Sequence, residues 1–371
     1  MLRALKTRQL APIFRQRVVT RLLTTAPAAK LSYVFDIDGV LMHGGEAIPQ
    51  GRQALLELEQ AQVPWILLTN GGGKSEVQRT EELSKALDFY IDPQQIVQSH
   101  TPFRGLSGQY ERVLVVGGDH DMSRQVAELY GFKHVIVPAD IVRATPHVWP
   151  YHRLTEKDDF WVLPKKECDQ LVDPNSGMNK VDAVFIFNDP RDWGTDVQIV
   201  MDMLLSQDGH IGTKANWHPR PSEPTLKSPS IPIYFSNNDL LWANQYPLPR
   251  LGQGALRTTI EALFTELTGY KLRSTIIGKP VRETYEFAEE TLDDWRQKTF
   301  NLAPGSWEKV YMVGDNPASD IDGANRYGWE SMLVRTGVFR DADLPDAVAK
   351  PNAGIYDNVL DAVRAGIKRH Y

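Results

Sequence analysis

Two carboxylates, Asp36 and Asp38, follow a hydrophobic run near the start of the chain, and Gly39 comes directly after them. The run and the glycine are typical of a buried strand that ends in a turn. Residues i and i+2 of an extended segment point to the same side, so both carboxylates can address one reacting group. The pair predicts a nucleophile beside an acid–base partner or a divalent cation site, with an acid-rich turn as the alternative.

Three further apolar runs end in polar residues in the same way. The runs cover residues 63–68, 274–278 and 309–314, and they end in Thr69, Lys279 and Asp315, with Asp320 at the start of the next helix. In an open α/β sheet, the ligand site lies beyond the carboxyl ends of the strands. The four strand ends are therefore expected to converge, although they are spread over most of the sequence.

The side chains expected at this edge of the sheet complement one another chemically. Acids around one point repel each other and have raised pKa values unless a cation neutralises them, and Mg²⁺ prefers oxygen ligands. A lysine and a threonine, together with backbone amides at the strand ends, suit a phosphoryl group. The sequence therefore predicts one site that holds both Mg²⁺ and a phosphate ester.

The elements that must position these residues alternate between apolar runs and amphipathic helices. Helices are expected at residues 52–60 and 76–87, between runs buried on both faces, which is typical of a parallel sheet. A second set of strands and helices begins at residue 112. Residues 144–180 lack periodicity and are expected to be a long surface excursion. The first pattern resumes at residue 252, so we expect an α/β fold whose first sheet is interrupted by a second α/β unit.

The composition indicates a chain with a sizeable core. Its 371 residues are 42% hydrophobic and 24% charged, which suits one large or two modest domains. No stretch approaches about 18 consecutive apolar residues, so no membrane span is expected. The net charge of −6 argues against a general nucleic-acid or anionic-membrane surface. The single cysteine, Cys168, is expected to be a structural or incidental thiol and not a nucleophile.

The amino-terminal segment differs in composition from the rest of the chain. Its charged residues are all basic (Arg3, Lys6, Arg8, Arg15, Arg17, Arg21 and Lys30), and the first carboxylate is Asp36. A basic, amphipathic segment without an apolar h-region is typical of a mitochondrial transit peptide. We expect residues 1–30 to be such a leader, with a disordered basic arm as the alternative.

The order and placement of these motifs resemble the haloacid dehalogenase superfamily of phosphotransferases. The matching segments are residues 36–40, 67–70 and 278–280, and residues 314–316 together with 319–324. The resemblance extends from residue 31 to about residue 340. The large insert between the second and third motifs is similar to that of the subclass with an α/β C2-type cap. The Thr-Asn-Gly-Gly-Gly run from Thr69 and the basic leader resemble the mitochondrial group named haloacid dehalogenase-like hydrolase domain-containing proteins.

The resemblance implies a fold and a domain division. It implies a Rossmann-like parallel sheet with helices on both faces, plus an inserted α/β C2-type cap domain. The expected division is a transit peptide at residues 1–30, core at 31–110, cap at 111–250 and core again at 251–371. Because related capped enzymes often pair through the cap, a homodimer through this domain is a further expectation.

The resemblance also assigns roles in the reaction. It implies that Asp36 is the nucleophile that forms an aspartyl-phosphate, and that Asp38 protonates the leaving oxygen and then activates water. Lys279 is expected to offset charge on Asp36 and, with Thr69, to hold the phosphoryl oxygens. The expected Mg²⁺ ligands are Asp36, Asp315 and, through its backbone carbonyl, Asp38, with Asp320 in support.

Further substrate contacts are expected from two turns. The implied residues are Asn70 and Gly71 beside the second strand, and Asn237, Asn238 and Asp239 where related caps reach toward the substrate. For the second group, a simple turn is the alternative. The tripeptide Gly73-Lys74-Ser75 also resembles part of a nucleotide P-loop, but Leu68 occupies the position of that motif's first glycine.

The implied function is a Mg²⁺-dependent phosphatase that acts on a small phosphorylated metabolite in the mitochondrial matrix. Asp38 favours phosphate esters, because dehalogenases lack this second acid. A catalytically silent member that keeps the fold and binds a partner is one alternative. A role in glycerophospholipid biosynthesis is the other, although the sequence lacks the D-G-x2-A-R signature of phosphatidyl transferases.

Overall fold

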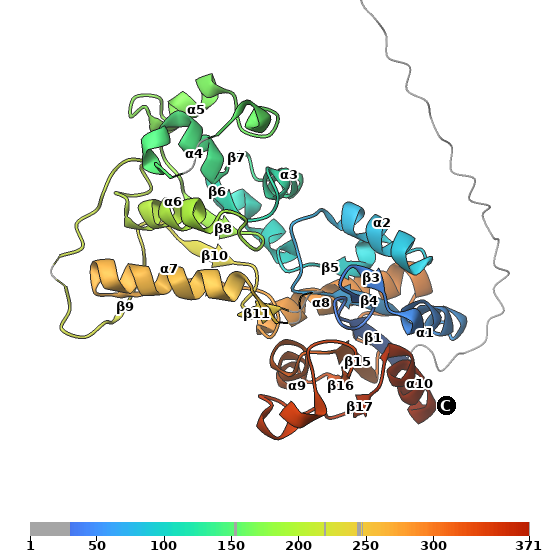
Figure 1. Ribbon diagram of the computed structural model, residues 1–371. Helices are drawn as coiled ribbons and strands as arrows, with labels where there is room; N and C mark the ends of the chain where they lie inside the picture. Colours follow the sequence, from blue (N-terminus) through green and yellow to red (C-terminus); the bar gives the residue numbers. More distant parts are fainter. Residues whose placement is uncertain (1–29, 152–153, 219, 243–245, 247, 371) are drawn as a thin grey trace, which may run out of the picture.

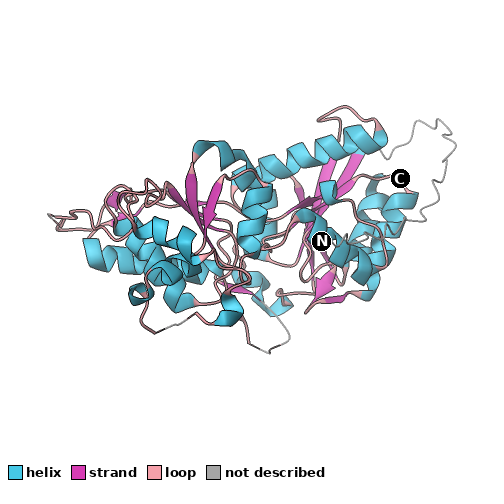
Figure 2. Ribbon diagram, turned by 90° about the horizontal axis from the view of Figure 1, so that it is seen from above, coloured by secondary structure: helices cyan, strands magenta, loops and turns pink. Residues whose placement is uncertain are grey.

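The computed structural model describes residues 30–151, 154–218, 220–242, 246 and 248–370 (Figure 1). The leader expected at residues 1–30 therefore lies outside the described residues, except for Lys30. The described chain forms two α/β units that lie beside each other in Figure 1. One unit contains the blue and red segments, and the other contains the green and yellow middle of the chain. Each unit has its own group of strands with helices around it (Figure 2).

The first unit is built on a six-stranded sheet in which all neighbouring strands are parallel. In spatial order the strands are β17 (Ile355–Tyr356), β16 (Glu330–Val334), β15 (Lys309–Gly314), β1 (Leu31–Phe35), β4 (Trp65–Leu68) and β5 (Ile96–Val97). β1 lies between β15 and β4, so the strand ends that lead into Asp36, Asp315 and Thr69 are neighbours. The parallel sheet expected from the sequence is thus confirmed.

Helices cover both faces of this sheet. Tyr33 and Phe35 of β1 belong to a core cluster with α1 (Pro49–Gln60), α2 (Glu76–Leu87) and α10 (Val359–His370). Val34 faces the other way, into a cluster with α8 (Arg282–Trp295) and α9 (Asp322–Tyr327). Burial of a large apolar side chain contributes about 1.5–3 kcal/mol. Packing on both faces therefore holds the carboxyl end of β1 firmly in place.

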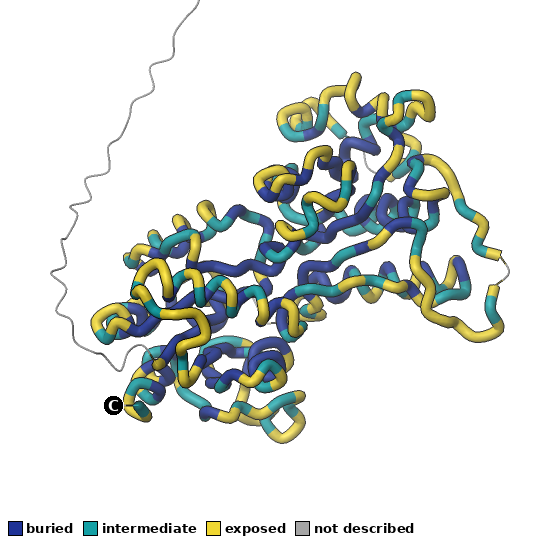
Figure 3. The backbone as a smooth tube through the Cα atoms, turned by 180° about the vertical axis from the view of Figure 1, so that it is seen from behind, coloured by how far each residue is buried: buried dark blue, intermediate teal, exposed yellow. Residues whose placement is uncertain are grey.

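The second unit is built on a five-stranded parallel sheet. In spatial order its strands are β14 (Thr275–Ile276), β10 (Ile233–Phe235), β8 (Ala183–Ile186), β6 (Arg112–Val116) and β7 (His134–Ile136). One face packs against α4 (Pro138–Ala144), α6 (Trp193–Leu205) and α7 (Gln253–Thr268), and the other against α3 (Met122–Leu129). Buried backbone runs through the centre of both units (Figure 3).

Three two-stranded sheets complete the described strands. They pair β2 (Met42–His43) with β3 (Glu46–Ala47), β13 (Lys271–Leu272) with β9 (Leu226–Lys227), and β11 (Leu241–Trp242) with β12 (Arg250–Leu251). Among the described residues, we find no helix whose length and hydropathy would let it cross a membrane.

The structure differs from the sequence-based expectation at the edges of the insert. β14 pairs with β10, so the second sheet extends beyond the boundary expected at residue 250. The chain returns to the first unit only after this strand, because α7 and β14 complete the second unit's layers.

The expectation of a surface excursion over residues 144–180 is wrong in part. The segment contains a helix, α5 (Lys165–Val172), and Cys168 on this helix is buried with Val137, Ala139 and Val162. The Cys168 thiol donates a hydrogen bond to the Leu163 carbonyl at 3.2 Å, and burial raises its pKa to about 12. These contacts fit the structural role expected for this cysteine.

Candidate active site

Three carboxylates meet at the carboxyl edge of the first sheet. Phe35 of β1 pairs with Val313 of β15, so Asp36 and Asp315 leave the sheet side by side. A single π-helical turn, η7 (Pro317–Ile321), then brings Asp320 back to the same place. One oxygen from each of the three acids lies within 4.8 Å of the others, and all three residues are buried. The predicted convergence of these acids is therefore present in the structure.

Lys279 lies between two of these acids. Its Nζ is 2.9 Å from Oδ1 of Asp36 and 2.6 Å from Oδ1 of Asp320, and the side chain is 1% exposed. Burial alone would lower the pKa of Lys279, but the two carboxylates raise it above its ordinary value. The ammonium group is therefore charged at neutral pH and offsets part of the acids' charge.

The route by which Lys279 arrives differs from the expectation. The sequence suggested a strand of the first sheet that ends at this lysine, but the preceding strand, β14, belongs to the second sheet. The side chain of Asn70 holds the connection instead. Its Oδ1 accepts a hydrogen bond from the Lys279 N–H at 2.8 Å, and its Nδ2 donates to the Lys279 carbonyl at 3.0 Å.

The acids carry more negative charge than the lysine can neutralise. Burial, and then the charges of Asp320 and Asp36, raise the pKa of Asp315 well above its ordinary range. Burial also raises the pKa of Asp320 to about 7, although Lys279 lowers it. Oδ1 of Asp36 is buried, and the Lys279 ammonium at 2.9 Å is its partner. A divalent cation that prefers oxygen ligands fits this donor set.

Glycines leave the room that the Asp315 carboxylate needs. A Cβ added to Gly39 would lie 2.4 Å from Oδ2 of Asp315, and one added to Gly337 would lie 1.9 Å from the same atom. Gly39 also has φ +87°, a conformation that side chains other than glycine rarely adopt. The backbone N–H of Val338 donates to this oxygen at 2.7 Å. The loop over residues 337–338 was not identified from the sequence.

Asp38 lies beside the three acids but faces open space. Its side chain is 60% exposed, and its Oδ2 lies 3.6 Å from a guanidinium nitrogen of Arg79. The carboxyl group lines the cavity described below, and desolvation there raises its pKa although Arg79 lowers it. A raised pKa suits a group that must deliver a proton. The sequence analysis did not identify Arg79 as a site residue. Its place in the first turn of the expected helix over residues 76–87 could have indicated it.

The turn after β4 is fixed by its own hydrogen bonds. The Thr69 hydroxyl accepts a hydrogen bond from the Gly71 N–H at 3.0 Å, and Thr69 is buried. Ser75 then caps α2 through a reciprocal bond with Gln78, in which each side chain accepts from the other residue's backbone N–H. Such caps contribute about 1 kcal/mol each. The turn therefore presents Thr69, Asn70 and Gly71 to the cavity in a fixed arrangement.

A cavity of about 960 Å³ lies between the two units, above these acids. From the first unit it is lined by Asp36, Asp38, Thr69, Asn70, Gly71, Arg79, Lys279 and Asp315, and from the second by Asn188, Arg191, Asn237, Asp239, Leu241, Trp242, Arg250 and Leu251. The structure thus brings the expected residues to one chamber, with Asp320 buried behind Lys279.

The three expected residues of the second unit have different positions. Asp239 accepts a hydrogen bond from Asn70 Nδ2 at 3.0 Å, and burial raises its pKa to about 6. The side chain of Asn237 donates to the Asn70 carbonyl at 3.0 Å. Asn238 is exposed instead, accepts a hydrogen bond from Arg257 Nε at 2.7 Å and is not in the cavity wall. Its neighbours in the turn face the first unit, and Asn238 faces away.

Comparison with known families gives two matches, one at each end of the chain. The family described as haloacid dehalogenase-like hydrolase matches residues 33–133, and a related family described as HAD-hydrolase-like matches residues 276–362. The first match contains Asp36, Asp38 and Thr69, and the second contains Lys279, Asp315 and Asp320.

Two fungal proteins are similar over nearly the whole chain. A mitochondrial hydrolase of Saccharomyces cerevisiae is 42% identical over 358 residues, which cover 92% of this chain and 96% of the relative. A cardiolipin synthase (CMP-forming)/mitochondrial hydrolase fusion protein of Schizosaccharomyces pombe is 41% identical over 99% of this chain. The chain spans only 58% of that longer protein.

Solved structures share the fold at low sequence identity. A p-nitrophenyl phosphatase from Archaeoglobus fulgidus superposes with a TM-score of 0.58 at 16% identity, covering 91% of this chain and 99% of the other. A possible sugar phosphatase from Cytophaga hutchinsonii gives a TM-score of 0.59 at 17% identity, covering 90% and 95%. At these identities the likeness concerns the two-unit α/β architecture alone.

Proposed function

Because the chain belongs to the haloacid dehalogenase-like hydrolases, we propose that it is a phosphomonoester hydrolase that works through an aspartyl-phosphate on Asp36. The observation that carries this proposal is the position of Asp36. Its carboxylate lies 2.9 Å from the buried Lys279 ammonium and beside Asp315, in the wall of a cavity large enough for a small phosphate ester.

The proposed reaction has two steps. In the first, a carboxylate oxygen of Asp36 attacks phosphorus, the bond to the ester oxygen breaks, and Asp38 gives its proton to the departing alcohol. In the second, Asp38 takes a proton from water, the water oxygen attacks phosphorus, and inorganic phosphate leaves as the Asp36 carboxylate is restored. Lys279 and the Thr69–Gly71 turn hold the phosphoryl oxygens during both steps. The exposure of Asp38 toward the cavity fits its exchange of protons with substrate and water.

Mg²⁺ is the cofactor we propose. The side chains of Asp36 and Asp315 and the backbone carbonyl of Asp38 would hold it, and Asp320 would support the site from the helix start. When bound, the ion neutralises the acids and draws charge from the phosphoryl oxygens. The closeness of the three acids and the excess of carboxylates over the single ammonium group of Lys279 support this assignment.

Hydrolysis of p-nitrophenyl phosphate by the purified protein with Mg²⁺ tests this proposal. We expect Asp36→Asn to lower kcat by at least about 1,000-fold, because it removes the nucleophile and keeps the side chain's shape. Asp357→Asn is the matched control, since this acid is 80% exposed and pairs with Arg335 at the surface. A wild-type protein without activity on any phosphate ester would favour the silent, partner-binding alternative.

The wall of the cavity favours a substrate with an apolar portion. Leu241, Trp242 and Leu251 line it, and these residues are 48%, 44% and 60% exposed. We propose that they receive the apolar part of the ester while its phosphate reaches Asp36. A glycerophospholipid-related phosphate has this form, and the Schizosaccharomyces pombe relative is named as a fusion with cardiolipin synthase. A rise of kcat/KM with alkyl chain length in a series of alkyl phosphates, abolished by Trp242→Ser, would support this substrate class.

We also propose that the protein resides in mitochondria, in the matrix, and that the second unit acts as the cap over the active site. The names of both fungal relatives and the basic amino-terminal composition support the location. The position of the second unit's residues in the cavity wall supports the cap. Pairing of two copies through this unit stays a prediction, which the mass of the protein in solution would test.

A further inference from the structure

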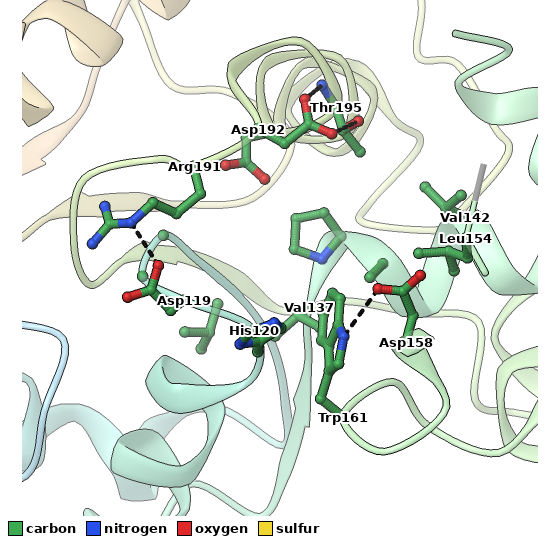
Figure 4. A pocket seen from close by; sticks show the side chains of 16 residues that line it. Asp119, His120, Val137, Val142, Leu154, Asp158, Trp161, Arg191, Asp192 and Thr195 are labelled. Carbon is green, nitrogen blue, oxygen red and sulfur yellow. Dashed lines mark hydrogen bonds and ion pairs between the residues drawn. The ribbon is translucent and has the colours of Figure 1, made fainter. Parts of the chain in front are cut away.

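A second cavity, of about 260 Å³, lies within the second unit (Figure 4). Its wall includes residues 117–120 after β6, residues 137–139 after β7, and Arg191 and Asp192 after β8. Trp161 and Asp158 close it from the 144–180 segment. Arg191 is the one lining residue that it shares with the larger cavity among the residues described, so it is separate from the candidate active site.

The cavity occupies a place where sheets of this topology bind ligands. When the strands of the second sheet are numbered along the chain, their spatial order is 2-1-3-4-5. The chain passes from the first strand, β6, to β7 at one edge of the sheet, and from the third, β8, to β10 on the opposite side. In open α/β sheets, the crevice beyond such a pair of strand ends is the usual ligand site. Glycines 117 and 118, both at positive φ, form the turn after β6 at this crevice.

One acidic residue in the wall has no side-chain partner among the described residues. Asp196, in the first turn of α6, exposes 7% of its surface. It accepts no hydrogen bond and forms no ion pair with any residue in the described ranges. Burial, and then the charge of Asp192, raise its pKa to about 7, although Arg191 lowers it. The positive potential at the amino terminus of α6 favours the ionised carboxylate, but burial disfavours it more strongly.

The other acids in the wall already have partners, as Figure 4 shows. Asp119 accepts a hydrogen bond from Arg191 Nε at 2.9 Å, and Asp158 accepts one from Trp161 Nε1 at 3.1 Å. Asp192 caps α6 by accepting from the Thr195 N–H and hydroxyl. The helix terminus is therefore occupied by a carboxylate, which disfavours an anionic ligand. Among the described lining residues, four carry a carboxylate and one a guanidinium group, and this balance favours a cation.

The remaining lining sets the shape of the ligand. Val137, Ala139, Val142 and Leu154 contribute apolar surface to the wall, and Trp161 contributes an aromatic ring. His120 packs against Trp161 with ring centroids 5.5 Å apart. We propose that this cavity binds a small organic ammonium ion, with its charged nitrogen against Asp196 and its apolar body between Trp161 and Val142.

Calorimetric titration of the full-length protein with 2-phenylethylamine tests the proposal, in the presence of Mg²⁺. The neutral analogue 2-phenylethanol is the ligand control. We expect saturable binding of the amine, and at least about tenfold weaker binding of the alcohol, because a hydrogen bond to a buried charge is lost. Equal binding of amine and alcohol would overturn the charge-based site.

Three variants locate the binding. Asp196→Asn keeps the side chain's size and is expected to weaken amine binding at least about tenfold. Asp202→Asn is the matched control on the same helix, since Asp202 already accepts a hydrogen bond from Gln198 at 2.8 Å and does not line the cavity. Ala139→Leu fills the cavity and should abolish binding while the protein's circular dichroism is unchanged. The absence of saturable binding to the wild type, or equal binding by Asp196→Asn, would overturn the proposal.

Discussion

The side-chain amide of Asn70 holds the backbone of Lys279 on both sides, accepting from its N–H at 2.8 Å and donating to its carbonyl at 3.0 Å. The same amide nitrogen donates to Asp239 at 3.0 Å. One side chain thus joins the turn after β4, the lysine at the acid cluster and the cavity wall of the second unit. The position of the Lys279 ammonium between Asp36 and Asp320 depends on this connection.

Asn70→Ala should therefore damage both stability and catalysis. It leaves the buried Lys279 N–H and carbonyl without their partner, which costs about 1–3 kcal/mol for each unsatisfied group. We expect a lower Tm and a fall in kcat of at least about tenfold with p-nitrophenyl phosphate. Asn238→Ala is the control, because that side chain is exposed and contacts Arg257. Equal effects of the two substitutions would show that the Asn70 clamp has no special role.

Removal of the metal should destabilise the protein. One oxygen from each of the three acids lies within 4.8 Å of the others, so we expect a divalent cation to bind the folded state and relieve their repulsion. At about 100 times its Kd, such a ligand adds about 2.7 kcal/mol of stability. Thermal melting with Mg²⁺ and with a chelator should show this difference. The shift should disappear in Asp315→Asn and remain in Asp357→Asn; a shift that persists in Asp315→Asn would place the metal elsewhere.

The acid–base role that we propose for Asp38 predicts that its importance depends on the leaving group. An alkyl phosphate needs a proton on its departing oxygen, whereas p-nitrophenolate departs readily without one. Asp38→Asn should lower kcat by about 100- to 10,000-fold with an alkyl phosphate. With p-nitrophenyl phosphate, the same substitution should slow the first step, phosphoryl transfer to the enzyme, by a much smaller factor. The rate of this step is measured from the burst of p-nitrophenol. Equal losses with the two esters in this step would argue against proton donation by Asp38.

The raised pKa of Asp196 predicts that the stability of the protein depends on pH. Its folded-state pKa of about 7 lies above the ordinary value of about 3.9, so the folded state binds more protons than the unfolded state. The protonated carboxyl group therefore contributes to the free energy of unfolding. This contribution is fully present below about pH 4 and is lost as pH rises through 7, and the total loss is about 2–4 kcal/mol. The fall in Tm between pH 5 and pH 8 should accordingly be smaller in Asp196→Asn than in the wild type. An identical pH profile would show that Asp196 titrates normally.

The sequence predicted those features that depend on local pattern. Residues 76–87 form a helix with the expected bounds, because Thr80, Leu83 and Leu87 recur on its buried face and Ser75 caps the first turn. The acids after β1 and β15 were expected together because the carboxyl ends of parallel strands share one edge. Neither inference required knowledge of the insert.

The sequence could not predict features that depend on contacts between the units. The strand before Lys279 joins the second sheet, since β10 offers an edge that no local pattern reveals. Arg191 reaches both cavities through the placement of the turn after β8. The side of the turn that Asn238 takes is set by Arg257 on α7. In each case, tertiary packing selects one strand partner or side-chain direction among several that the local sequence allows equally well.

The proposed aspartyl-phosphate is tested most directly by mass spectrometry of the protein quenched in acid during turnover of p-nitrophenyl phosphate. We predict that the peptide containing Asp36 gains the mass of one phosphoryl group, and that this gain is absent in Asp36→Asn and in unreacted protein. A phosphoryl group on another residue would contradict this mechanism. Turnover without any labelled peptide would also contradict it, if it were seen in a variant that accumulates the intermediate, such as Asp38→Asn.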